Sequence, residues 1–93
     1  MARVIYKFGG TSVGDTRRLY RAARRIAAAH RAGDEVVAVL SAQAGATDAL
    51  LARGREIDPD CGGREADSLL STGEQVSVSL CALALARLGV PAV

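Results

Sequence analysis

Hydrophobic and polar positions change period several times along the chain, and each change marks the limit of a predicted element. Residues 3–8 are β-branched and aromatic, as in a short strand, and residues 35–41 form a second apolar strand. Between them, apolar positions at helical spacing predict a helix over about 15–32. Gly33 is placed to end that helix as its C′ residue.

The second half of the chain has mainly helical patterns. Helices are predicted over about 47–57, 64–70 and 73–88, with a turn-rich loop at Asp58–Gly63 and a further strand starting near Val90. Strands that alternate with helices indicate parallel βαβ units, with right-handed crossovers and helices on both faces of the sheet. The expected fold class is α/β, a partial three-layer α/β/α sandwich with a mainly parallel sheet.

The helix predicted over residues 73–88 has apolar side chains all around its axis, so it needs cover on several sides. We therefore expect residues 1–93 to be the N-terminal piece of a longer domain, or a truncated descendant of one, and we expect the isolated chain to associate. The apolar positions of this helix are Val76, Val78, Leu80, Cys81, Leu83, Leu85 and Leu88.

Composition narrows the class of protein. Of the 93 residues, 49% are hydrophobic and 3% aromatic, so one small domain is expected with Ala, Val and Leu in its core. A net charge of +2 gives no whole-chain case for nucleic-acid binding. Cys61 and Cys81 lack C-x-x-C spacing and no leader sequence precedes them, so we interpret them as reduced thiols of a cytoplasmic protein. No apolar run reaches the length of a membrane span, because serines and Arg87 interrupt Val76–Leu88.

The helix predicted over 15–32 carries a basic stripe opposite Leu19, Ala23 and Ile26. We expect no aromatic rings to interleave with the stripe, and no nucleic-acid motif surrounds it. We interpret it as a solvated face, with nucleic-acid binding as the more distant alternative. His30 is the only histidine and is interpreted as structural, which excludes Ser-His-Asp and His-rich metal sites within the chain. The stripe consists of Arg17, Arg18, Arg21, Arg24 and Arg25.

The turn after the first strand combines the only lysine with two adjacent glycines. Gly9 and Gly10 let the backbone approach an anion closely, and Lys7 adds the full charge that backbone dipoles lack. The hydroxyls of Thr11 and Ser12 are expected to face the ligand. The spacing matches neither a Walker A loop nor GxGxxG, so a phosphate-handling turn competes with a tight turn that has a solvated lysine and helix-capping hydroxyls.

Further candidate groups follow the second strand and open the last helix. Ser41 and Thr47 can each donate to a ligand carboxylate or phosphate, or cap the helix predicted over 47–57. Ser71 and Glu74 match a capping box, so the Glu74 carboxylate is open to capping or to a ligand. Ligands of parallel sheets gather at the carboxyl ends of the strands, where Lys7 and Ser41 are both placed.

Three motifs together resemble one protein family. Lys7–Gly14 (KFGGTSVG) is similar to the opening motif of the aspartokinases, and Ser41–Asp48 and Leu70–Gln75 fall where that family has its next two motifs. Between Ser41 and Thr47, Gln43 and Ala44 depart from the Met-Gly that is common there. The resemblance covers nearly the whole chain and implies a truncated amino-acid kinase fold. It also implies ATP-dependent phosphorylation of the L-aspartate β-carboxylate, the first step towards lysine, threonine and methionine.

The resemblance also implies roles for individual residues. Lys7 would stabilise charge on the transferred phosphoryl group, and Gly9, Gly10, Thr11 and Ser12 would bind phosphate. Ser41, Thr47 and Glu74 would hold aspartate, Glu74 through the substrate's amino group. Mg2+ would be held mainly by the nucleotide phosphates, and the full-length protein would be a homo-oligomer. The later substrate, metal and adenine segments and the ACT regulatory domains are absent from residues 1–93, so we expect no turnover by this chain alone. A non-catalytic, kinase-derived module that docks on a full-length subunit is the alternative.

Overall fold

The computed structural model describes all residues, 1–93, and has two parallel strands with helices packed beside them. The strands pair in register from Arg3 with Glu35 to Phe8 with Leu40. The elements in chain order are β1 (Arg3–Phe8), the 3-10 turn η1 (Gly10–Val13), α1 (Thr16–Arg31), β2 (Glu35–Leu40), α2 (Ala46–Ile57) and α3 (Gly63–Arg87).

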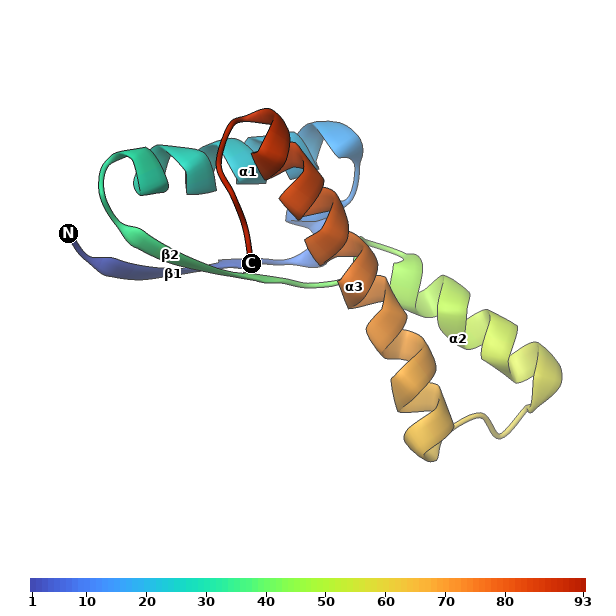
Figure 1. Cartoon of the computed structure of the whole chain (residues 1–93). Helices are drawn as coiled ribbons and strands as arrows, with labels where there is room; N and C mark the ends of the chain where they lie inside the picture. Colours follow the sequence, from blue (N-terminus) through green and yellow to red (C-terminus); the bar gives the residue numbers. More distant parts are fainter.

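Alternation along both strands separates a core face from an open face. Phe8 and Leu40 are buried at the strand ends, while Ile5, Val37 and Val39 on the opposite face are exposed. Figure 1 shows α1 lying along one side of the sheet, with α3 crossing it steeply and α2 lying beside the first half of α3. The expected fold class, a truncated α/β sandwich with a parallel sheet, is confirmed. Within these residues the helical cover lies on one face.

The core is made where α1 and the second half of α3 meet the sheet. Leu19 and Ile26 of α1 are buried there, together with Cys81 and Leu85 of α3. Burial raises the pKa of the Cys81 thiol, because the thiolate loses its hydration in this apolar surrounding. The predicted stop at Gly33 is confirmed, since this residue follows the C-cap of α1 with φ of +96° and donates its N–H to the His30 carbonyl.

Two sequence predictions about the second half of the chain are wrong. The helices predicted over 64–70 and 73–88 form the single helix α3, because the hydroxyls of Ser71 and Thr72 donate to the carbonyls of Ser68 and Leu69 instead of starting a new helix. No strand starts near Val90. Its backbone N–H donates to the Leu85 carbonyl, which ties this residue to the end of α3.

Because α3 is one continuous helix, its length and hydropathy match those of a membrane-spanning helix. With 25 residues, α3 is long and apolar enough to cross a membrane by length and composition, so the prediction that no run reaches this length is wrong for the folded helix. The core helix of a soluble protein passes the same test. The buried residues of α3 lie towards α1, α2 and the sheet and are Ala66, Gly73, Ser77, Cys81, Ala84 and Leu85. A buried side of this kind is typical of a helix that packs against the core of its own domain.

Candidate functional site

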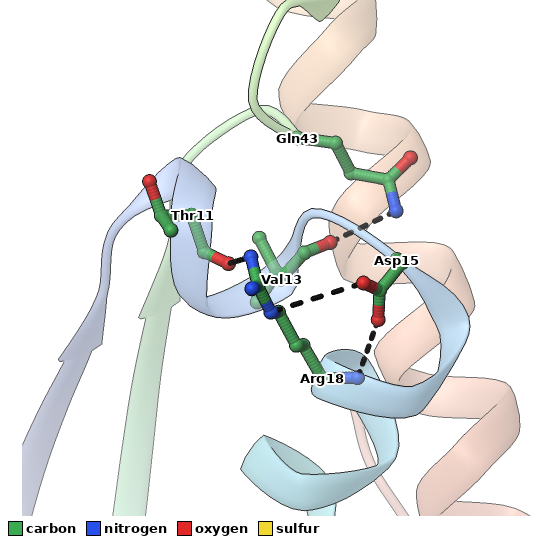
Figure 2. Close-up of polar contacts among 5 residues, drawn as sticks. All are labelled: Thr11, Val13, Asp15, Arg18 and Gln43. Atoms are coloured by element: carbon green, nitrogen blue, oxygen red, sulfur yellow. Dashed lines mark hydrogen bonds and ion pairs between the residues drawn. The ribbon is translucent and has the colours of Figure 1, made fainter.

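The segments that follow the two strands are joined directly to each other. The backbone N–H of Ser41 donates to the Phe8 carbonyl at 3.0 Å, and that of Ala44 donates to the Gly10 carbonyl at 3.1 Å. The Gln43 side-chain amide donates to the Val13 carbonyl at 2.9 Å, which ties the loop after β2 to the end of η1 (Figure 2). The parallel pairing therefore places both candidate loops at one edge of the sheet, as the sequence predicts.

The two glycines of the turn have different surroundings. A β-carbon at Gly10 would lie 2.7 Å from the Ala42 carbonyl oxygen and 3.3 Å from the Ala44 nitrogen, so this glycine is needed for the contact between the loops. A β-carbon at Gly9 would meet no atom within 4 Å. Gly9 has a φ of −74°, which any residue adopts. The backbone of Gly9 therefore borders open space that a ligand can enter.

The middle of helix α3 crosses the loop that follows β2. A β-carbon at Gly73 would lie 3.1 Å from the Ala42 β-carbon and 3.5 Å from the Leu50 δ1 carbon, so a larger residue would crowd this crossing. Glu74 comes directly after Gly73 and is exposed. The three segments that carry or adjoin the candidate residues are thus in contact: η1, the loop that follows β2, and the middle of α3.

The capping alternatives are not what the structure shows. Gly45, with a φ of +83°, is the N-cap of α2, and Thr47 lies inside that helix. Asp15 caps α1 by accepting from the Arg18 backbone N–H at 2.8 Å. Ser71 and Glu74 both lie within α3, so the capping box predicted for them is wrong.

The candidate side chains share one property, which is that their polar groups form no hydrogen bond or ion pair within the chain. All but Ser41, which is half-buried, are exposed. Polar groups at the ends of strands that have no internal partner are available to a ligand. The set consists of Lys7, Thr11, Ser12, Ser41, Thr47 and Glu74.

The structure also separates these groups by the face of the sheet. Lys7 lies on the open face of β1, opposite Val39 in the register, while its neighbour Phe8 lies in the core. Thr11 and Ser12 border a cavity of about 240 Å³ on the α1 side, which Lys7 does not line. The residues around this cavity are Phe8, Thr11, Ser12, Arg18, Arg21, Ala22 and Arg25.

Sequence reasoning missed this cavity and one property of the basic stripe. All five arginines are exposed, as expected of a solvated face. Aromatic rings nevertheless lie against two of them, contrary to the prediction: Arg24 is 5.6 Å from the Tyr20 ring, and Arg25 is 5.3 Å from the Tyr6 ring. The spacing of the arginines correctly predicts a common helix face, but the position of η1 above that face could not be inferred.

Comparisons with known proteins agree with the motifs. The model of the amino acid kinase family matches residues 2–93. An aspartate kinase of Pseudomonas putida is 44% identical over 93 residues, which is 100% of this chain and 23% of that protein. An aspartokinase of Thermus thermophilus is 45% identical over 92 residues, covering 99% of this chain and 23% of its own.

A solved structure gives the same result for the fold. The crystal structure of aspartate kinase from Synechocystis matches with a TM-score of 0.92 and 43% sequence identity. The match covers 100% of this chain and 16% of that one. The chain therefore spans less than a quarter of the length of the relatives named here.

Proposed function

The chain belongs to the amino acid kinase family, and from that premise we propose that it is the N-terminal part of an aspartate kinase. Such an enzyme transfers the γ-phosphoryl group of ATP to the β-carboxylate of L-aspartate and forms ADP and 4-phospho-L-aspartate. The observation that best supports this function is the gathering of unpartnered polar groups at the carboxyl ends of β1 and β2.

The turn after β1 is proposed to handle phosphate. Phosphoryl transfer needs positioning and charge neutralisation more than covalent chemistry. Lys7 supplies a mobile cation with no internal partner, and the open space beside Gly9 lets the backbone N–H groups of Gly9 and Gly10 approach phosphate oxygens. The exposed hydroxyls of Thr11 and Ser12 are further donors at the same turn.

The loop after β2 and the middle of α3 are proposed to hold aspartate. Ser41 continues β2 by its hydrogen bond to Phe8, which fixes its backbone next to the phosphate turn. Thr47 and Glu74 are exposed on two helices that pack on each other. In this assignment the hydroxyls donate to a substrate carboxylate, and the Glu74 carboxylate accepts from the substrate ammonium group.

The residues present fit ATP better than they fit a protein-held metal ion. Open space beside Gly9 and the unpartnered Lys7 suit a phosphate chain. Residues 1–93 contain no group of three or more His, Cys, Asp or Glu side chains that could hold a metal. In this proposal Mg2+ is held mainly by the nucleotide phosphates, where it would neutralise charge on the oxygens.

The remaining parts of the proposal concern the whole protein. Because residues 1–93 match 23% of the relatives' length, we expect the isolated chain to have no aspartate kinase activity. We place the complete protein in the cytoplasm, as a homo-oligomer in the pathway to lysine, threonine and methionine, with no nucleic-acid or membrane partner.

The test is a chimera in which residues 1–93 replace the matching segment of the Thermus thermophilus aspartokinase. ADP release is measured with ATP, Mg2+ and one acceptor at a time: aspartate, glutamate, acetylglutamate or UMP. The proposal predicts turnover with aspartate alone. Turnover with another acceptor, or none from a folded chimera, contradicts it.

The apolar surface of α3 favours a second candidate function. Val76, Val78 and Leu83 are exposed on this helix, as a surface that docks on another chain would be. A non-catalytic module of this kind would bind a full-length aspartate kinase subunit without adding activity. Sedimentation of the isolated chain with that subunit tests it, and a stable complex together with an inactive chimera would favour it.

A further inference from the structure

The arginine stripe of α1 meets the turn after β1 at a cavity that shares Thr11 and Ser12 with the proposed phosphate turn but is not lined by Lys7, Gly9 or Gly10. Arg18, Arg21 and Arg25 lie three and four positions apart, so they project from one side of α1. Phe8 and Ala22, both buried, form the apolar base of the cavity, while the exposed Thr11 and Ser12 form its polar rim. Three permanent cations and two hydroxyls therefore surround one space of about 240 Å³.

Contacts with neighbouring residues hold two of these arginines in place. The Arg18 guanidinium donates to the Thr11 carbonyl at 3.3 Å and lies 3.8 Å from an Asp15 carboxylate oxygen (Figure 2). The Arg25 guanidinium carbon lies 5.3 Å and 6.0 Å from the centres of the Tyr6 and Phe8 rings. Such contacts lower the entropy that a ligand must remove when it binds.

Arg21, between these two residues, has no side-chain partner in the chain. Asp15 is the one carboxylate in contact with any of the three arginines, so positive charge is in excess at the cavity. An unpartnered guanidinium between two positioned ones is an arrangement that can bind two oxygens of one anion at once.

From this geometry we propose that the cavity binds a phosphate group through its arginines, on the α1 side of the turn and away from Lys7. A space of about 240 Å³ is smaller than the roughly 300–1,000 Å³ of sites for drug-sized molecules, so it fits one anionic group rather than a whole nucleotide. Arg17 and Arg24 do not line it, which distinguishes a local site from attraction by the whole stripe. The inference does not depend on the proposed kinase activity.

The experiment is a titration of the 93-residue chain with inorganic phosphate, followed by NMR at the backbone amides of Arg21, Ala22 and Arg25, which have no role in the proposed kinase site. All samples carry Leu83→Lys to limit association, because Leu83 is an exposed apolar residue of α3. The variants are Arg21→Ala and its matched control Arg17→Ala, since both arginines are exposed on α1 and neither has a side-chain partner. Arg21→Lys keeps the charge and removes the planar fork.

We expect saturable shifts at these amides. Arg21→Ala should weaken phosphate binding by about tenfold or more and Arg17→Ala by less than about twofold, because only the first removes a charge-assisted hydrogen bond. Equal effects of the two variants, or shifts that do not saturate, would overturn the site and leave a diffuse positive surface.

Two further samples identify the source of the phosphate and separate this site from the kinase proposal. If ADP shifts the same amides and loses affinity in Arg21→Ala, the ligand is a nucleotide phosphate; if ADP leaves them unshifted, it is free phosphate. Lys7→Ala should leave the phosphate titration unchanged. A loss equal to that in Arg21→Ala would show that the cavity is not a distinct site.

Discussion

Gly10 and Ala42 lie so close together that a β-carbon on Gly10 would be 2.7 Å from the Ala42 carbonyl oxygen. The contact joins the turn after β1 to the loop after β2, beside the hydrogen bond from the Ala44 N–H to the Gly10 carbonyl. It therefore fixes the phosphate side of the proposed site relative to the aspartate side.

Replacing this glycine should loosen the joint. Gly10→Ala is expected to lower the free energy of unfolding by about 1–3 kcal/mol, because backbone atoms must move to admit the methyl group. Gly9→Ala is the matched control, since its methyl group meets nothing and its φ suits alanine; we expect no loss of stability. Urea unfolding of both variants measures the difference, and equal stabilities would show that the loops adjust without cost.

Glu74 should matter for aspartate and not for folding. It is exposed, lies inside α3 and caps nothing, so Glu74→Gln should change the free energy of unfolding by less than about 0.5 kcal/mol. In the chimera, the same change should weaken aspartate binding by about tenfold or more, because an ion pair with the substrate ammonium is lost. Asp67→Asn, an exposed acid on the same helix, is the control. Unchanged aspartate affinity in Glu74→Gln would exclude the contact.

Cys81 should make stability fall at alkaline pH. Its pKa is raised by burial in the folded state, while the unfolded thiol titrates near its ordinary value of about 8.5. Above that value the unfolded chain releases the proton and the folded chain keeps it, so the free energy of unfolding decreases as pH rises towards the folded-state pKa. Unfolding curves from pH 7 to 10, compared with Cys81→Ala, isolate this effect. Parallel pH dependences of the two proteins would contradict it.

The exposed apolar positions of α3 should make the isolated chain bind hydrophobic dyes and associate. The Leu83 side chain is 65% exposed, and Val76 and Val78 are further exposed apolar residues of the same helix. Leu83→Lys should reduce dye fluorescence and shift sedimentation towards the monomer. The control Ala86→Lys adds the same charge at an exposed alanine, and we expect it to reduce dye fluorescence and association less than Leu83→Lys does. A dye-silent, monodisperse wild-type monomer would mean that residues 1–93 close their own core.

The strands, α1 and the meeting of the two loops could be predicted from sequence because each depends on local pattern and sheet topology. Residues 3–8 match β1, and Gly33 ends α1 as expected. The continuity of α3 could not be predicted from sequence. The hydroxyls of Ser71 and Thr72 can cap the start of a helix, but they can equally donate to carbonyls of the preceding turn within a helix, as they do here.

The other differences between the sequence predictions and the structure depend on how the elements pack in three dimensions. Gly45 takes the N-cap position of α2, which is the alternative role considered for Thr47, and its positive φ is not encoded in the pattern. The cavity around Arg21 exists only because η1 folds over α1, and neither segment alone predicts it. The position of Lys7 on the open face follows from strand alternation and was predictable in principle.

Lys7 is proposed to stabilise charge on the transferred phosphoryl group, and kcat of the chimera with Lys7→Ala tests this role most directly. Removing a charge that acts mainly in the transition state should lower kcat about a hundred- to a thousand-fold, with little change in KM for aspartate. Lys7→Arg should not restore the rate, because the guanidinium is larger and planar, and Arg17→Ala should leave it unchanged. A kcat near that of the parent chimera in Lys7→Ala would contradict the account and make Lys7 a solvated residue of a tight turn.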